Sequence, residues 1–139
     1  MLGESGLRSE IVEDDKSLWE EQRARQRAGD EDEAVVRVSG LPALLPTLVE
    51  AAERAGGGLV GRAGLGLYWL RMPGASADQL ERLREELSPH PCVILDRPPS
   101  LDIDPWGPVE SGSLELMRRI KNGFDRAGVC SPGTYVGGL

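Results

Sequence analysis

Apolar residues recur along the chain between residues 34 and 96 with two different spacings. Four segments in this stretch are short and rich in β-branched or aromatic residues, a composition typical of strands. They are residues 34–39, 58–62, 65–71 and 91–96. Two longer segments carry leucines three and four positions apart, which predicts helices with one apolar face. They are residues 42–55 and 76–87.

Residues at the ends of these segments support the boundaries. Ser76 and Gln79 have the spacing of a capping box, in which each side chain accepts a hydrogen bond from the backbone of the other. Gly56-Gly57-Gly58 follows the first helix, where glycine permits the left-handed backbone that ends many helices. Ala63-Gly64 predicts a tight turn between the second and third strands.

The predicted order is strand, helix, strand, strand, helix, strand, which is the split βαβ arrangement of a ferredoxin-like α+β fold. Such a fold has a four-stranded antiparallel sheet with both helices on one face. Val36 and Val38 alternate with Arg37 and Ser39 in the first strand. We therefore expect the valines to face the helices and Arg37 to face the open side of the sheet.

Two less regular segments flank the predicted ferredoxin-like unit, which spans residues 34–97. Residues 1–33 form an acidic arm, with a mostly polar helix expected over 16–28. Residues 98–139 begin with proline-broken stretches, continue with an amphipathic helix, and end in an irregular tail. The pattern therefore divides the chain into an arm, a ferredoxin-like domain, and a C-terminal helix with its tail.

Charge is distributed unevenly along the 139 residues, whose formal net charge is −7. Residues 1–33 hold 11 acidic and 5 basic side chains, so the arm accounts for six of the seven net negative charges. No basic stripe is present that could displace counterions from phosphates, which argues against a nucleic-acid partner. The rest of the chain is almost neutral.

The composition also bears on location. The longest apolar run is far shorter than the roughly 20 residues that a transmembrane helix needs. The first residues include no basic start followed by an apolar stretch, so we expect no export signal. Cys92 and Cys130 are the only cysteines and make no disulfide framework. These features predict a cytoplasmic protein.

No group of residues in the sequence forms a self-contained catalytic set. His90 lies between two prolines, which favours a solvated loop residue over a general base. Cys92 begins an apolar strand, which favours a small core residue over a nucleophile. Asp102 and Asp104 have no third ligand at a useful spacing, so we expect no metal site. The glycines at 56–58 end a helix and do not begin one, so they are not a phosphate cradle.

The most informative stretch is residues 116–133, Leu-Met-Arg-Arg-Ile-Lys-Asn-Gly-Phe-Asp-Arg-Ala-Gly-Val-Cys-Ser-Pro-Gly. It resembles the closing segment of the FAD-linked oxidases of the vanillyl-alcohol oxidase superfamily. That segment has a helix, a phenylalanine-aspartate-proline turn, a glycine and an asparagine-proline-glycine exit. Arg126 stands where the family usually has proline, and Ser131 stands where it usually has asparagine.

Four further stretches are similar to the FAD-binding subunit of glycolate oxidase, within the same superfamily. They are 36–39 (Val-Arg-Val-Ser), 67–71 (Leu-Tyr-Trp-Leu-Arg), 104–107 (Asp-Pro-Trp-Gly) and 137–138 (Gly-Gly). The ferredoxin-like order also matches the superfamily's cap domain. The resemblance implies a cap and C-terminal part, with the domain that holds most of the FAD outside this sequence.

The resemblance further implies a substrate and a cofactor. The substrate would be a small 2-hydroxy acid such as glycolate or lactate, and FAD would accept the hydride. The cap's open sheet face would cover the flavin ring, and there we place Arg37, Arg62 and Tyr68 as substrate-binding residues. A guanidinium binds a carboxylate with two parallel hydrogen bonds, and a phenol can orient a hydroxyl. A surface or sheet-edge role for each of the three remains equally open.

In the C-terminal tail, the resemblance implies cofactor contacts. The residues that match the family's exit are Ser131, Pro132 and Gly133. An alternative function is a non-catalytic protein-binding module, or a subunit that completes a separate flavoprotein. Its partner would be a flavin domain or an iron-sulfur protein, bound through the open sheet face and the acidic arm.

Overall fold

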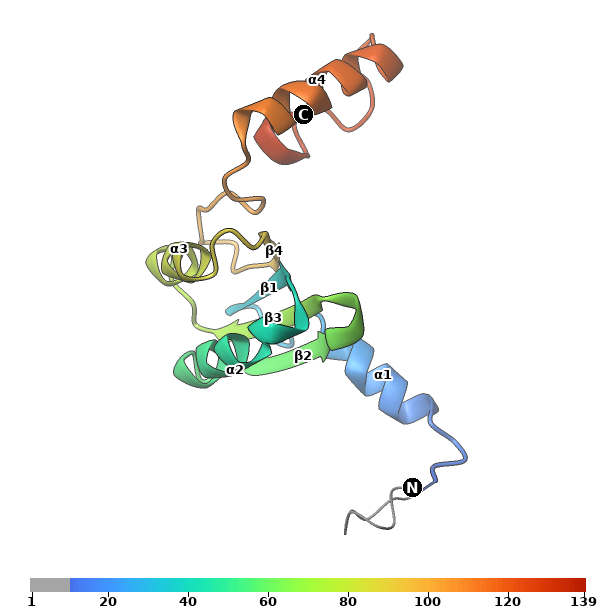
Figure 1. The fold of residues 1–139 in the computed structure, drawn as a ribbon, viewed down its shortest axis with the longest axis vertical. Helices are drawn as coiled ribbons and strands as arrows, with labels where there is room; N and C mark the ends of the chain where they lie inside the picture. The colour runs from blue at the N-terminus through green and yellow to red at the C-terminus, as the bar shows by residue number, and fades with distance from the viewer. Residues whose placement is uncertain (1–10) are drawn as a thin grey trace.

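The computed structural model describes residues 11–139, in which four strands form an antiparallel sheet of order β2-β3-β1-β4 (Figure 1). The strands are β1 (Glu33–Ser39), β2 (Gly58–Arg62), β3 (Leu67–Pro73) and β4 (Cys92–Asp96). The α-helices are α1 (Lys16–Ala24), α2 (Leu45–Arg54), α3 (Ala77–Glu86) and α4 (Ser111–Phe124). Single 3₁₀ turns are η2 (Pro42–Leu44), η3 (Ala63–Leu65) and η4 (Val136–Gly138).

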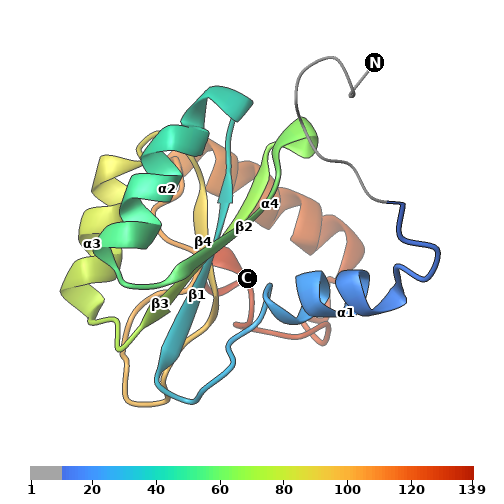
Figure 2. The same cartoon turned by 90° about the horizontal axis from the view of Figure 1, so that it is seen from below.

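The topology is the predicted ferredoxin-like α+β arrangement. Helix α2 connects β1 to β2 and helix α3 connects β3 to β4, so each crossover spans one intervening strand. Figure 2 shows α2 and α3 on one side of the sheet and α1 on the other, and Figure 1 shows α4 beyond the β4 edge, away from the sheet. No helix among the described residues is long and apolar enough to cross a membrane.

The core lies between the sheet and the two crossover helices. Val36 and Val38 are buried there, as their alternation with Arg37 predicts. Other large core residues include Leu48, Leu80, Leu83, Tyr68 and Leu70, from α2, α3 and β3, and Ile94 from β4. Ile103, in the irregular stretch after β4, also belongs to this core. The segment after the sheet therefore packs against the ferredoxin-like unit.

The predicted capping box is present at the start of α3. The Gln79 N–H donates to Ser76 Oγ at 3.3 Å, and the Ser76 N–H donates to Gln79 Oε1 at 2.9 Å. These bonds satisfy two backbone donors that the helix leaves free. The box therefore sets the residue at which α3 begins.

Glycine at the end of α2 is required by close packing. Gly56 has φ +62°, the left-handed conformation expected at a helix exit. A Cβ at Gly57 would lie 1.8 Å from the Arg71 carbonyl oxygen, a distance that no side chain permits. The bare backbone at residue 57 thus allows the chain to pass directly into β2 beside β3.

Strand β3 begins two residues later than the sequence predicts. The expected tight turn at Ala63-Gly64 is extended into η3, and Gly66 adopts φ +64° before the strand starts. A Cβ at Gly66 would lie 2.4 Å from the Gly40 carbonyl oxygen. The Gly40 N–H also donates to the Gly66 carbonyl at 2.9 Å, so the turn is held against the start of the β1–α2 connection.

The arm is attached to the sheet by ion pairs where it meets β1. Helix α1 ends at Ala24, earlier than the predicted residue 28, and it buries no residue. Arg27 Nε donates to Asp96 at 2.8 Å, and the Ala28 N–H donates to the same carboxylate at 2.9 Å. Asp96 closes β4, so these bonds tie the arm to the edge of the sheet.

Candidate functional site

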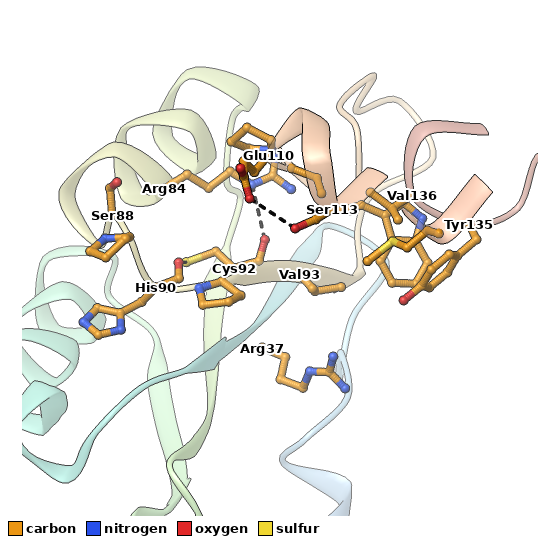
Figure 3. Close-up of a pocket in the computed structure, with 16 residues that line it drawn as sticks. Arg37, Arg84, Ser88, His90, Cys92, Val93, Glu110, Ser113, Tyr135 and Val136 are labelled. Atoms are coloured by element: carbon orange, nitrogen blue, oxygen red, sulfur yellow. Dashed lines mark hydrogen bonds between the residues drawn. The ribbon is translucent and has the colours of Figure 1, made fainter. Parts of the chain in front are cut away.

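A cavity of about 610 Å³ lies beside β4, between the sheet, the start of α4 and the C-terminal tail (Figure 3). Its lining combines strand residues with side chains from the loop after β4 and from the tail. The residues that define its chemistry are Arg37, Arg84, Val93, Trp106, Glu110 and Tyr135. The sequence brings these positions together only through the tertiary fold, since 98 residues separate the first from the last.

Arg37 is the cationic group without a partner in this cavity. It lies on the face of β1 opposite the core and is directly paired with Val93 of β4. Its side chain is half-buried, and within residues 11–139 its buried Nε has no hydrogen-bond partner. A buried donor without a partner costs about 1–3 kcal/mol. Nε itself is closed to solvent, but the Arg37 side chain lines the cavity, so an anion there could pair with its guanidinium.

Arg84, the second guanidinium at the cavity, is already used by the fold. It donates to the carbonyl oxygens of Asp104 at 2.7 Å, Pro105 at 3.0 Å and Cys92 at 3.4 Å. These bonds cover the outer edge of β4, where the Ile94 N–H also donates to the Pro105 carbonyl at 2.8 Å. Arg84 thus holds the loop that forms one wall and adds positive charge nearby.

Two aromatic rings form the opposite wall. Trp106 and Tyr135 meet edge to face, with ring centroids 4.6 Å apart and an interplanar angle of 66°. Asp104 accepts a hydrogen bond from the Trp106 N–H at 3.0 Å, which fixes the loop that carries the indole. Tyr135 comes from the tail, so the tail must fold back along α4 to bring it there.

Asp125 organises that reversal of the tail. Its carboxylate accepts hydrogen bonds from the Cys130 and Val129 N–H groups, each at 3.0 Å, and lies 3.4 Å from Lys121 Nζ. The two backbone hydrogen bonds, from Cys130 and then Val129, hold the pKa of Asp125 below its usual range. The carboxylate is therefore charged wherever the tail is folded at neutral pH.

The one thiol that lines the cavity, Cys92, is unsuited to act as a nucleophile. Burial raises the pKa of the Cys92 thiol to about 11, so the thiolate is scarce at neutral pH. This agrees with the predicted role of Cys92 as a small core residue.

Glu110, just before α4, accepts a hydrogen bond from Ser113 Oγ at 3.2 Å. No three metal-binding side chains of the described residues gather in one place. The geometry suits binding of an anion.

Of the three predicted substrate-binding residues, Arg37 lies in the cavity and the other two do not. Arg62 is exposed on β2, where its guanidinium carbon lies 5.9 Å from the centroid of the Trp69 ring. That distance is typical of a cation–π contact on the open face of the sheet. The cavity therefore uses a different set of residues from the one predicted.

The predicted place of Tyr68 on the open face is wrong. Its side chain is 0 % exposed and lies in the core with Val38, its neighbour across β1 and β3. Paired residues of adjacent strands share a face, so Tyr68 follows Val38 to the face covered by α2 and α3, and Trp69 takes the opposite face, where it is also buried. The Tyr68 hydroxyl lies 3.5 Å from the Leu41 carbonyl oxygen.

The three predicted cofactor-binding residues form an exposed turn of the tail. Ser131 has φ +43° and Gly133 has φ +75°, and Thr134 Oγ1 donates to the Ser131 carbonyl at 2.8 Å. The Thr134 N–H also points back to Ser131, at 3.4 Å, and is used inside the turn. Ser131, Pro132 and Gly133 are exposed, and they make no backbone cradle for a pyrophosphate.

Trp106 and Tyr135 are the functional residues that sequence reasoning missed. Trp106 stands in a proline-broken stretch and Tyr135 in an irregular tail, so neither belongs to a periodic pattern. The sequence feature that could have indicated them is the presence of two aromatic residues in segments without regular structure. Aromatic rings in such segments often pack against another ring or an apolar surface.

Comparison of the chain with protein-family models, with curated proteins and with solved structures finds no match.

Proposed function

We propose that this chain is the cap and C-terminal part of an FAD-dependent oxidoreductase that oxidises a small 2-hydroxy acid of the glycolate or lactate type. The observation that carries the proposal is the half-buried Arg37 guanidinium, whose Nε has no partner among residues 11–139 and which faces the cavity on the open side of the sheet. A carboxylate in the cavity would pair with this guanidinium through charge-assisted hydrogen bonds.

A neighbouring arginine shows why Arg37 is the preferred anchor. Arg71 lies on the same face of the sheet, but its guanidinium donates to Glu33 at 2.9 and 2.6 Å and is already neutralised. Arg62 is exposed to solvent, where a single ion pair contributes little. Arg37 alone of these three combines partial burial, an unpaired Nε and a place in the cavity.

FAD, when bound, would accept the hydride from the alcohol carbon, the hydroxyl proton would pass to a base of the flavin-binding domain or to water, and the substrate would leave as a 2-oxo acid. This chain's own part is to bind the carboxylate through Arg37 and to exclude water with the Trp106–Tyr135 wall. The exposed turn at residues 131–133 would touch the cofactor from the tail. The pyrophosphate would be held by a flavin-binding domain.

The decisive test is to isolate the chain from its source with the proteins bound to it. We expect a complex that contains FAD and reduces an artificial electron acceptor when a 2-hydroxy acid is added. Purified alone, the chain should show no flavin absorbance between roughly 350 and 500 nm, because it lacks a phosphate cradle. A complex without flavin, or without activity that depends on a 2-hydroxy acid, would refute the proposal.

A second candidate function is protein binding without catalysis, and helix α4 favours it. Leu116, Ile120 and Phe124 are exposed on α4, with Phe124 at 93 %. Arg118 and Arg119 lie between them in the sequence. An exposed apolar stripe with nearby arginines suits a partner surface that is both apolar and acidic, such as a flavin domain or an iron-sulfur protein.

The α4 surface can be tested separately from the cavity. Phe124→Asp should weaken partner binding at least tenfold, because a buried charge would oppose the contact. Leu65→Asp is the matched control, since Leu65 is an exposed apolar residue in η3, outside α4. If both variants keep the partner equally well, α4 is not the interface.

A further inference from the structure

The cavity beside Arg37 is large for the smallest 2-hydroxy acids. Its volume of about 610 Å³ falls within the range of roughly 300–1,000 Å³ found for pockets that hold drug-sized ligands. A ligand of five non-hydrogen atoms, such as glycolate, would leave most of that space filled with water.

The walls around Arg37 are mainly apolar. Val93 is paired with Arg37 across β1 and β4, and it is half-buried. Further apolar lining comes from the connection between α3 and β4, from the loop after β4, from α4 and from the tail. Those residues include Trp106, Met117, Tyr135 and Val136. Val136 is buried, and the Trp106–Tyr135 pair offers an edge-to-face arrangement that a third ring can extend.

Polar groups in the cavity have an asymmetric layout. Arg37 points to one side of β4, whereas Glu110 lies on the other side (Figure 3). Arg84 is held by three backbone carbonyls and is not available as a second bidentate anchor. A ligand with one carboxylate can pair with Arg37, but a second carboxylate extended toward Glu110 would meet a like charge.

We infer that the cavity selects a monocarboxylate with a bulky apolar or aromatic side chain, in preference to glycolate or lactate. As a statement about a substrate, this rests on the proposed oxidation of a 2-hydroxy acid and changes only the size of the acid's side chain from that of glycolate or lactate; as a statement about binding, it rests on the cavity alone. The carboxylate pairs with Arg37, and the side chain of the ligand displaces water from the wall formed by Val93, Trp106 and Tyr135.

The experiment is to titrate carboxylic acids into the whole chain and to measure their binding by calorimetry and by changes in backbone NMR shifts. The probes are mandelate, glycolate, 2-hydroxyglutarate and phenylacetate. We expect mandelate to bind at least tenfold more tightly than glycolate or 2-hydroxyglutarate. Arg37→Met should weaken the binding of mandelate at least tenfold. Trp106→Leu should reduce the ratio of mandelate affinity to glycolate affinity to less than threefold. Arg82→Met, an exposed arginine of α3, is the control and should bind as the unmodified chain does.

Each outcome has a defined meaning. Equal or tighter binding of glycolate, or unchanged binding by Arg37→Met, overturns the inference. If Trp106→Leu fails to fold, Tyr135→Ala tests the same wall, with thermal melting as the check. Phenylacetate lacks the hydroxyl group, so phenylacetate binding that equals mandelate binding supports the cavity's selectivity and counts against a 2-hydroxy acid substrate. Failure of flavin-linked turnover would refute the proposed function without altering these affinities.

Discussion

The Arg71 guanidinium holds the Glu33 carboxylate with two hydrogen bonds, from Nε to Oε1 at 2.9 Å and from Nη2 to Oε2 at 2.6 Å. Glu33 opens β1, Arg71 lies on β3, and the Gly29 N–H adds a third hydrogen bond to the carboxylate at 2.7 Å. The Glu33 side chain is 5 % exposed and the Arg71 side chain 27 %. The pair therefore joins the arm to the sheet at a nearly buried point.

The first prediction concerns stability and pH. Desolvation is the largest single influence on Glu33 and would raise its pKa, but the hydrogen bonds from Arg71 and Gly29 outweigh it, so the pKa is lowered. The Arg27 hydrogen bonds likewise hold the pKa of Asp96 below its usual range. A carboxyl group whose pKa is lower in the folded than in the unfolded state stabilises the fold fully at a pH above its unfolded-state pKa. That stabilisation is lost as the pH falls through the folded-state pKa. Stability should therefore decrease below about pH 4.

Glu33→Gln tests this directly. The free energy of unfolding at pH 7 should fall by about 1–3 kcal/mol, since one charged acceptor is lost from a nearly buried pair. The variant should also lose part of the acid dependence seen in urea unfolding between pH 3 and pH 7. Glu31→Gln, at an exposed neighbouring position, should leave both unchanged. Equal acid sensitivity of the two variants would contradict the assignment.

The second prediction concerns the approach of β2 to β3. Gly57→Ala would place a Cβ 1.8 Å from the Arg71 carbonyl oxygen, so the backbone of both strands must move. We expect a loss of at least about 3 kcal/mol in urea unfolding. Gly58→Ala is the matched control, because a Cβ there meets nothing within 4 Å, and it should change stability by no more than about 0.5 kcal/mol. Similar costs for the two variants would show that the close approach is unimportant.

The third prediction compares the two thiols. Cys130 is exposed, whereas Cys92 is buried with its pKa raised to about 11. At pH 8 roughly 0.1 % of Cys92 is thiolate, so iodoacetamide should modify Cys130 and leave Cys92 intact in the folded chain. Mass spectrometry should find one modification per chain, and two after unfolding in urea. Rapid modification of Cys92 in the folded chain would contradict its place in the core.

The fourth prediction concerns the tail. Asp125→Ala removes the acceptor for the Val129 and Cys130 N–H groups, so both amides should exchange with deuterium roughly tenfold faster. The amide of Val36 in the central strand should keep its protection. Asp102→Ala, at an exposed position before the cavity loop, serves as the control. Unchanged exchange at Val129 would mean that other contacts hold the tail.

The order of helices and strands could be predicted from the sequence, because the spacing of apolar residues and the residues that end each element are local features. The alternation of Val36, Arg37 and Val38 was sufficient to assign both faces of β1. Tyr68 was placed wrongly because its face depends on the register between β1 and β3, which the β3 sequence does not contain. The aromatic wall was missed for a similar reason, since Trp106 and Tyr135 meet only after the tail folds back.

Two glycines provide a way to recognise distant relatives of this chain. At Gly57 and Gly66, a backbone carbonyl oxygen occupies the space where a side chain would begin. Loop residues and core leucines can be replaced by other residues during evolution if the packing is kept. The clash of a Cβ with a backbone carbonyl oxygen does not depend on which side chains surround it. A homologue that keeps both close approaches, of residue 57 to β3 and of residue 66 to the β1–α2 connection, should therefore retain glycine at both positions, nine residues apart, even where little other identity survives.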